Sequence, residues 1–134
     1  MILLDTNVLL RLAADGPLSS EALHRIDVTY RGGGTVAVNP IAFWEVAMLG
    51  VKAPGSVDPN ALRARVLSRG LTETPFTSDI AIAAALLGTQ GFPVSDPADR
   101  FIAATAMNLG YELATTDRAI LNWDGPLRCI DARP

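Results

Sequence analysis

Residues 1–9 read Met1-Ile2-Leu3-Leu4-Asp5-Thr6-Asn7-Val8-Leu9. An unbroken apolar run that ends at an acid is typical of a buried strand in a parallel sheet. The mainly apolar residues 8–12 that follow predict a helix directly after this strand. Ligands bind at the carboxyl ends of strands in open α/β sheets, so Asp5 is the first candidate for a functional site.

Strand-like and helix-like segments alternate along the rest of the chain. Strands are expected at residues 35–38, 71–76, 111–115 and 127–130, and helices at 19–30, 40–51, 59–68, 79–88 and 97–109. Three of these helices begin with an N-cap residue followed by proline, at Asn39, Asp58 and Asp96. This alternation predicts an α/β fold with right-handed crossovers, a mainly parallel central sheet of about five strands, and helices on both faces.

Length and composition bound the class of protein. The 134 residues are 49% hydrophobic and 19% charged, so we expect a single domain, 1–134, with one sizeable core. The longest nearly uncharged apolar stretch, residues 80–87, is shorter than the roughly 20 residues of a membrane span. This stretch is apolar on every side, which predicts a helix that is buried or lies at a subunit interface. The first residues lack the basic segment of a secretory signal, so a cytoplasmic protein without membrane association is expected.

Residue counts exclude several chemistries. The single cysteine, Cys129, cannot form an intrachain disulfide, and the single histidine, His24, lies among polar residues of a predicted helix. Zinc sites with several histidine ligands and Ser-His-Asp catalysis are therefore disfavoured. The net charge of −3 argues against a polyanionic partner unless clustered acids bind divalent cations, which reverse the local sign.

Glu45 is the most informative acid. It shares one helical face with Trp44, Met48 and Lys52, and apolar residues fill the neighbouring face, so we expect a largely buried helix. No lysine or arginine stands three or four positions away. An unpaired buried ion costs on the order of several kcal/mol, so either a bound metal or a distant arginine must compensate.

Three further acids have defined positions in the predicted elements. Asp96 is expected to be a structural N-cap, whereas Asp99 points inward in the first turn of the same helix. Asp117 follows the strand at 111–115. Asp99 has a purely structural alternative as a capping-box acid, and Asp5 and Asp117 have one as turn or cap residues.

Convergence of Asp5, Glu45, Asp99 and Asp117 would require compensation. Two carboxylates about 4 Å apart repel by about 4 kcal/mol at an effective dielectric constant of about 20, so the group needs protons or cations. Oxygen ligands without histidine or cysteine select Mg²⁺ or Mn²⁺ over zinc. Such a site suits the hydrolysis of phosphodiesters.

Four ordered segments of the chain resemble the PIN-domain ribonucleases, most closely the VapC-like toxins of type II toxin–antitoxin systems. The segments are residues 1–9, Asn39-Pro40 followed by Glu45, residues 96–106, and Thr115-Thr116-Asp117. The resemblance implies a PIN-like three-layer fold and a Mg²⁺-dependent endoribonuclease that forms a homodimer and is inhibited by a cognate antitoxin.

The same resemblance implies roles for individual residues. The acidic positions fall on Asp5, Glu45, Asp99 and Asp117, of which Asp5, Asp99 and Asp117 would hold the metal. The implied orienting groups are Thr6, Asn7 and Thr116. Many members of the family carry a histidine before the late Asp-Pro pair, where this chain has Val94-Ser95.

Two other functions remain open from the sequence. An early strand-end Asp5 also fits a haloacid-dehalogenase-like phosphatase, but that family expects an aspartate at position 7 and a late lysine, whereas this chain has Asn7 and only Lys52. A PIN-like fold could also serve as a non-catalytic binding or assembly module, which the acids do not exclude.

Overall fold

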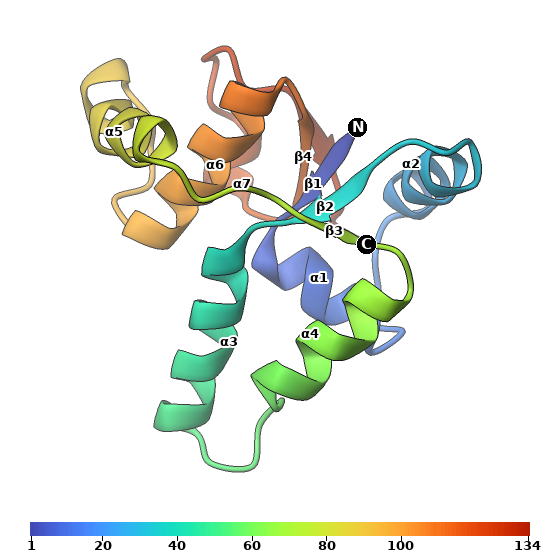
Figure 1. Ribbon diagram of the computed structural model, residues 1–134. Helices are drawn as coiled ribbons and strands as arrows, with labels where there is room; N and C mark the ends of the chain where they lie inside the picture. The colour runs from blue at the N-terminus through green and yellow to red at the C-terminus, as the bar shows by residue number, and fades with distance from the viewer.

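The strands form one parallel sheet with the first strand at its centre. The computed structural model describes residues 1–134, and the strand order is β3-β2-β1-β4-β5 with every neighbouring pair parallel (Figure 1). The strands are β1 (Ile2–Leu4), β2 (Val36–Val38), β3 (Thr72–Glu73), β4 (Glu112–Thr115) and β5 (Cys129–Asp131). The predicted α/β fold with a parallel five-stranded sheet is confirmed.

The helices fill the connections between strands. They are α1 (Thr6–Ala13), α2 (Ser20–Arg31), α3 (Pro40–Lys52), α4 (Pro59–Ser68), α5 (Ser78–Leu86), α6 (Pro97–Leu109) and α7 (Arg118–Leu121), with a 3-10 turn, η1 (Leu87–Gln90), after α5. The side chains of Asn39, Asp58 and Asp96 accept backbone N–H bonds at the starts of α3, α4 and α6. The cap-proline pattern therefore located these starts correctly.

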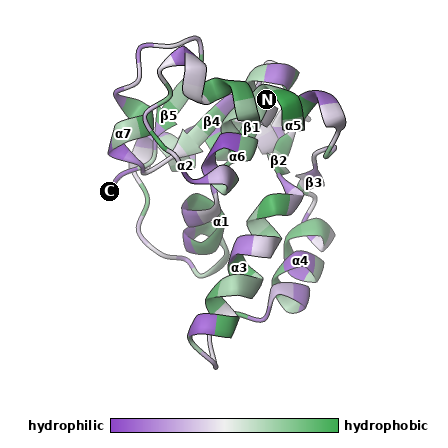
Figure 2. Cartoon of the chain, turned by 90° about the vertical axis from the view of Figure 1, so that its left-hand side faces the viewer, coloured by the Kyte–Doolittle hydropathy of each residue, from purple (hydrophilic) through white to green (hydrophobic).

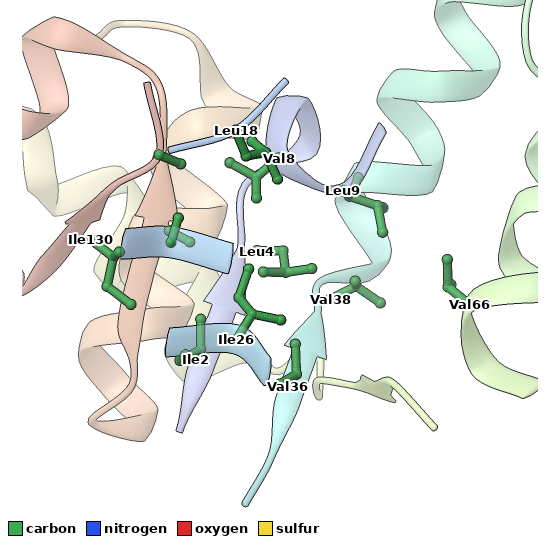
Figure 3. Packing of buried hydrophobic residues seen from close by; sticks show 14 of the residues in the cluster. Ile2, Leu4, Val8, Leu9, Leu18, Ile26, Val36, Val38, Val66 and Ile130 are labelled. Carbon is green, nitrogen blue, oxygen red and sulfur yellow. The ribbon is translucent and has the colours of Figure 1, made fainter. Parts of the chain in front are cut away.

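Alternate residues of β1 point to opposite faces of the sheet and enter two cores. Ile2 and Leu4 pack on the face covered by α1, α2, α3 and α4 (Figure 3). Leu3 packs on the other face, against α5, α6 and α7. These two cores make the three-layer arrangement that the resemblance implies.

Helices α3 and α4 pack on each other and extend past the carboxyl ends of the strands (Figure 1). Both helices carry hydrophobic and hydrophilic residues in alternation along their length (Figure 2). In α3 only Ala42 and Val46 are buried, whereas Trp44 is 56% and Leu49 is 47% exposed. The prediction of a largely buried α3 is therefore wrong, because the helix packs through a narrow stripe and leaves the edge of the sheet behind.

Other elements differ from expectation in their length. The strand expected at 71–76 pairs only over Thr72–Glu73, since β3 is an edge strand and Pro75 has no N–H to donate. Strand β5 begins at Cys129 rather than at residue 127, and the four-residue helix α7 is too short to show a period in the sequence.

The apolar helix α5 has one covered and one open face. Ile80 and Ala84 are buried, whereas Ile82 is 61% and Leu86 is 49% exposed. Its apolar residues on every side therefore do not mark a helix enclosed within the domain. None of the helices combines the length and apolar character needed to cross a membrane.

Candidate active site

The site lies where the chain leaves the two central strands in opposite directions. Strand β1 continues into α1, which packs in the first core, and the neighbouring β4 leads to α7, which packs in the second. This divergence makes a crevice at the carboxyl ends of the strands, the usual place for a ligand in open α/β sheets. Asp5 caps α1 and Asp117 caps α7, so both acids stand at this crevice.

Asp5 is the most deeply buried acid of the site, at 6% exposure. Its Oδ1 accepts the backbone N–H of Thr6 at 2.8 Å, and its Oδ2 accepts the hydroxyl of Thr115 at 2.7 Å. Burial raises the pKa of Asp5, these two hydrogen bonds oppose the rise, and the charge of Asp117 adds to it. The carboxylate is thus held in one orientation by two donors from different elements.

Glu45 approaches Asp5 from the middle of α3. Its Oε1 accepts the hydroxyl of Thr6 at 2.5 Å. Burial raises the pKa of Glu45, the Thr6 hydrogen bond opposes this, and the charges of Asp5 and Asp96 add to the rise. Glu45 takes part in no ion pair, so the distant arginine considered above as an alternative is absent.

Asp99 faces the other acids from the first turn of α6. Burial, followed by the charges of Asp5, Asp96, Glu45 and Asp117, raises the pKa of Asp99 to about 7. The carboxyl group therefore holds its proton near neutrality until a cation offsets the surrounding negative charge. The inward direction predicted for this side chain is confirmed, because Asp99 lines the same cavity as Asp5 and Glu45.

Asp96 belongs to this acidic cluster as well as to the helix cap. Its Oδ1 accepts the N–H of Ala98 at 3.0 Å, as predicted for an N-cap. One ligand atom from each of Glu45, Asp96 and Asp99 can be chosen so that the three lie within 4.8 Å of one another. The cap pattern alone did not indicate this second role, although residues three apart at a helix start lie on neighbouring positions of its surface.

Thr115 links Asp5 to Asp117. Its hydroxyl donates to Asp5 and accepts the backbone N–H of Asp117 at 3.0 Å. Asp117 in turn accepts the N–H groups of Ala119 and Ile120 through Oδ1, at 2.8 and 3.2 Å. Thr116 does not line the cavity, so the contact to the acids comes from its neighbour, which sequence analysis did not single out.

These side chains line one cavity of about 470 Å³ that is open to solvent. Its lining residues are Asp5, Thr6, Asn7, Leu10, Trp44, Glu45, Met48, Leu49, Lys52, Asp96, Asp99 and Asp117. Asp5, Glu45, Asp99 and Asp117 thus line one cavity together with Asp96. The carboxylate oxygens that lie within 4.8 Å of one another are those of Glu45, Asp96 and Asp99. Lys52 is the only basic residue in the lining.

The donor set fits a hard divalent cation. All candidate ligands are carboxylates, and no histidine or cysteine lines the cavity. Carboxylate oxygens are the preferred ligands of Mg²⁺ and Mn²⁺. Burial first, and then the charges of neighbouring acids, raise the pKa values of Asp5, Glu45 and Asp99, and a bound cation would oppose both effects.

Comparisons with solved structures support the same fold. A chain of the VapBC2 complex of Rickettsia felis, bound to a promoter DNA fragment, is 19% identical with a TM-score of 0.75 over 98% of this chain and 99% of that one. A chain of DNA-bound VapBC from Salmonella typhimurium is 23% identical with a TM-score of 0.67, covering 97% and 96%. A chain of VapBC-5 from Mycobacterium tuberculosis is 25% identical with a TM-score of 0.59, covering 98% and 97%.

Comparisons of the sequence itself give one match. No curated protein matches the sequence significantly. The PIN domain, however, matches residues 2–125, which is nearly the whole chain. The chain belongs to the PIN-domain family.

Proposed function

We propose that this chain is a Mg²⁺- or Mn²⁺-dependent endoribonuclease that hydrolyses RNA phosphodiester bonds. The observation that carries the proposal is the meeting of Asp5, Glu45, Asp96, Asp99 and Asp117 in one cavity without an arginine partner. Structural ion pairs would need a basic residue beside each acid, whereas cation binding needs the bare carboxylates that are present.

The residues of the cavity have distinct tasks in this proposal. A bound divalent ion supplies activation of water and neutralises charge on the leaving oxygen. Asp5, Asp99 and Asp117 are the proposed ligands, and Thr115 orients Asp5. Glu45 is held by Thr6, and its raised pKa suits a group that accepts a proton from the attacking water.

Asn7 and Asp96 complete the proposed site. Asn7 is exposed at the start of α1 and lines the cavity, so its amide is placed to hydrogen-bond the sugar or phosphate of a substrate. Asp96 caps α6 through Oδ1 and also has a carboxylate oxygen within 4.8 Å of ligand atoms of Glu45 and Asp99. Asp96 is thereby a further candidate ligand.

We further propose that the chain is the toxin of a type II toxin–antitoxin pair and acts in the cytoplasm, where its RNA substrate is found. The structural neighbours named above come from VapBC complexes, which supports an antitoxin as partner. A homodimer is proposed as well, since Ile82 and Leu86 leave an exposed apolar face on α5. Coexpression with any small protein encoded beside this gene, followed by copurification, tests the antitoxin partner.

The decisive experiment measures cleavage of structured RNAs by the purified protein with Mg²⁺, with Mn²⁺, and with chelator. We expect cleavage only with the metals, and a loss of about 10²-fold or more in Asp5→Asn, in line with removal of a central charge in an active site. Unchanged circular dichroism of this variant would show that the fold is retained. Equal cleavage by the wild type and the variant would contradict the proposal.

The non-catalytic module is the remaining alternative. It predicts that RNA stays intact under every metal condition while partner binding persists. The phosphatase alternative is disfavoured, because the chain belongs to the PIN-domain family and position 7 is asparagine.

A further inference from the structure

The acidic cavity has a second half that the carboxylates do not occupy. Its lining there comes from Leu10 of α1 and from Trp44, Met48, Leu49 and Lys52 of α3. The cavity therefore has a negatively charged end and an apolar end, and Lys52 is the only positively charged side chain in its lining. A ligand that fits this cavity would have a group that binds at the acidic end and an apolar group at its other end.

Trp44 is the main feature of the apolar end. It precedes Glu45 on α3, lines the cavity, and is 56% exposed, so a large part of its indole ring is open to a ligand. Met48 and Lys52 follow at one and two helical turns along the same face. The exposed part of Trp44 contributes nothing to the core, because the buried stripe of α3 consists of Ala42 and Val46.

A nucleotide matches both ends of this cavity. Its phosphate carries the charge that a cation held by the carboxylates attracts, and its base is a flat aromatic group that stacks on tryptophan. Exposed tryptophans also occur in protein interfaces. Here, however, the ring shares a concave cavity with the acids, and Lys52 supplies a charge complementary to a polyanion at the far end.

We propose that Trp44 stacks on an unpaired base of a single-stranded RNA substrate and that Lys52 contacts a phosphate of the same strand. This inference rests on the proposed ribonuclease function and adds the two residues outside the acidic cluster that hold the bound strand. In a duplex each base is covered on both faces by its neighbours, so only unpaired segments such as loops and ends can offer a base to Trp44. The contact with Trp44 therefore requires an unpaired base.

Tryptophan fluorescence provides a direct readout of this contact. The chain has two tryptophans, and Trp123 packs edge-on against Phe92 with ring centroids 5.1 Å apart, outside the cavity. An oligouridine of about ten nucleotides, a length suited to single-strand sites, is titrated with Ca²⁺ replacing Mg²⁺, and gels check that it stays intact. We expect quenching in the wild type and in Trp123→Phe, and a loss of the quenching in Trp44→Phe.

Binding affinities provide the second readout. Stacking of one base contributes about 1–3 kcal/mol, so Trp44→Ala should weaken oligouridine binding roughly 5- to 150-fold. Trp44→Phe should keep most of the affinity, since phenylalanine also stacks. An abasic oligomer with the same phosphates should bind the wild type and Trp44→Ala equally. Lys52→Met should lower the dependence of log affinity on log salt by about 0.7, as expected for one single-strand phosphate contact.

Val28→Ala is the matched control, because it removes an exposed apolar side chain from α2, outside the cavity. Its RNA affinity should equal that of the wild type. Unchanged oligouridine affinity in Trp44→Ala, or full quenching by the abasic oligomer, would overturn the inference. So would a Trp44→Ala variant that loses only copurification with an antitoxin, since the ring would then bind protein.

The design separates this inference from the proposed function. Wild-type protein that cleaves no RNA with Mg²⁺ refutes the function, whereas cleavage with unchanged affinity in Trp44→Ala refutes the stacking contact alone. Should Trp44→Ala fail to fold, the fluorescence of Trp44→Phe and Trp123→Phe still decides the question.

Discussion

The hydroxyl of Thr6 lies 2.5 Å from Oε1 of Glu45 and so joins the first residue of α1 to the middle of α3. The backbone N–H of the same threonine donates to Oδ1 of Asp5 at 2.8 Å. One residue therefore sets the spacing between two carboxylates that are far apart in the chain. Because these hydrogen bonds oppose the effect of burial on both pKa values, Thr6 also favours the charged forms that bind a cation.

Thr6→Val should separate these two contacts. Valine keeps the backbone N–H to Asp5 but removes the hydroxyl from Glu45, so the pKa of Glu45 should rise further. We expect a loss of about tenfold or more in cleavage rate, equivalent to about 1.4 kcal/mol. The pH dependence of RNA cleavage measures the shift, and Thr6→Ser, which keeps a hydroxyl, should retain most of the activity. Equal rates for the two variants would contradict this role.

Two substitutions at Asp96 should distinguish its role as a helix cap from the contribution of its charge to Mg²⁺ binding. Asparagine is as good an N-cap as aspartate and removes a charge from the acidic cluster, so Asp96→Asn should not lower the stability of the metal-free protein but should weaken Mg²⁺ binding. Asp96→Ala should weaken Mg²⁺ binding equally and also lower the free energy of unfolding by about 1 kcal/mol. Calorimetric titration and denaturant unfolding measure the two effects. Wild-type Mg²⁺ affinity in Asp96→Asn would show that Asp96 is only a cap.

Asp99 should make the metal-free protein less stable as the pH rises. Its pKa is raised from 3.8 to about 7, so between these values the unfolded chain has released a proton that the folded chain still holds. The free energy of unfolding should therefore fall across this interval and level off above about pH 7. In Asp99→Asn this contribution should be absent and the metal-free protein more stable at neutral pH.

The check is the difference between the unfolding free energies of wild type and Asp99→Asn at several pH values. This difference isolates the residue from other groups, such as Asp131, whose pKa is lowered to about 2 by Arg133. A difference that does not change with pH would contradict the raised pKa of Asp99.

Mg²⁺ should raise the melting temperature of the protein. A ligand at 100 times its Kd stabilises the folded state by about 2.7 kcal/mol. In a domain of this size that corresponds to an increase of roughly 5–15 °C. Differential scanning calorimetry with increasing Mg²⁺ measures the shift, and Asp5→Asn should reduce it strongly. A melting temperature that does not respond to Mg²⁺ or Mn²⁺ would count directly against a metal site.

Asn39 should hold α3 and α6 in the relative position that brings Glu45 to Asp99. It is fully buried, its Oδ1 accepts the N–H of Ile41 at 2.9 Å, and its Nδ2 donates to Thr105 of α6 at 2.8 Å. Asn39→Ala removes the cap and the link to α6, and we expect a loss of about 2–4 kcal/mol in the free energy of unfolding.

Asn60 provides the control for this prediction. It is exposed on α4, and its side chain accepts only a long hydrogen bond from Arg63, so Asn60→Ala should change stability by less than about 0.5 kcal/mol. Similar unfolding curves for both variants would show that the buried amide contributes no more than an exposed one.

The sequence by itself determined the order of strands and helices along the chain. It also determined that most of the acids lie at the ends of strands or the starts of helices. The apolar run before Asp5, the cap-proline pairs, and the inward stripe of α6 with Asp99 are local patterns, and local backbone chemistry sets them. Since parallel strands end at one edge of a sheet, Asp5 and Asp117 were predictable neighbours.

Only the tertiary structure decided which side chains contact these acids and which face of each helix stays open. A helical period groups Trp44 with Glu45 but does not tell whether another element covers that face, and here α3 runs past the sheet and leaves Trp44 exposed. The tertiary structure likewise decided that Thr115, and not Thr116, hydrogen-bonds Asp5. Alternate side chains along a strand point to opposite faces of the sheet, and the pairing register of β4 with β1 sets which of the two threonines lies beside Asp5. Asp96 joins the acids because α6 is packed against α3, a contact between distant segments that no local pattern specifies.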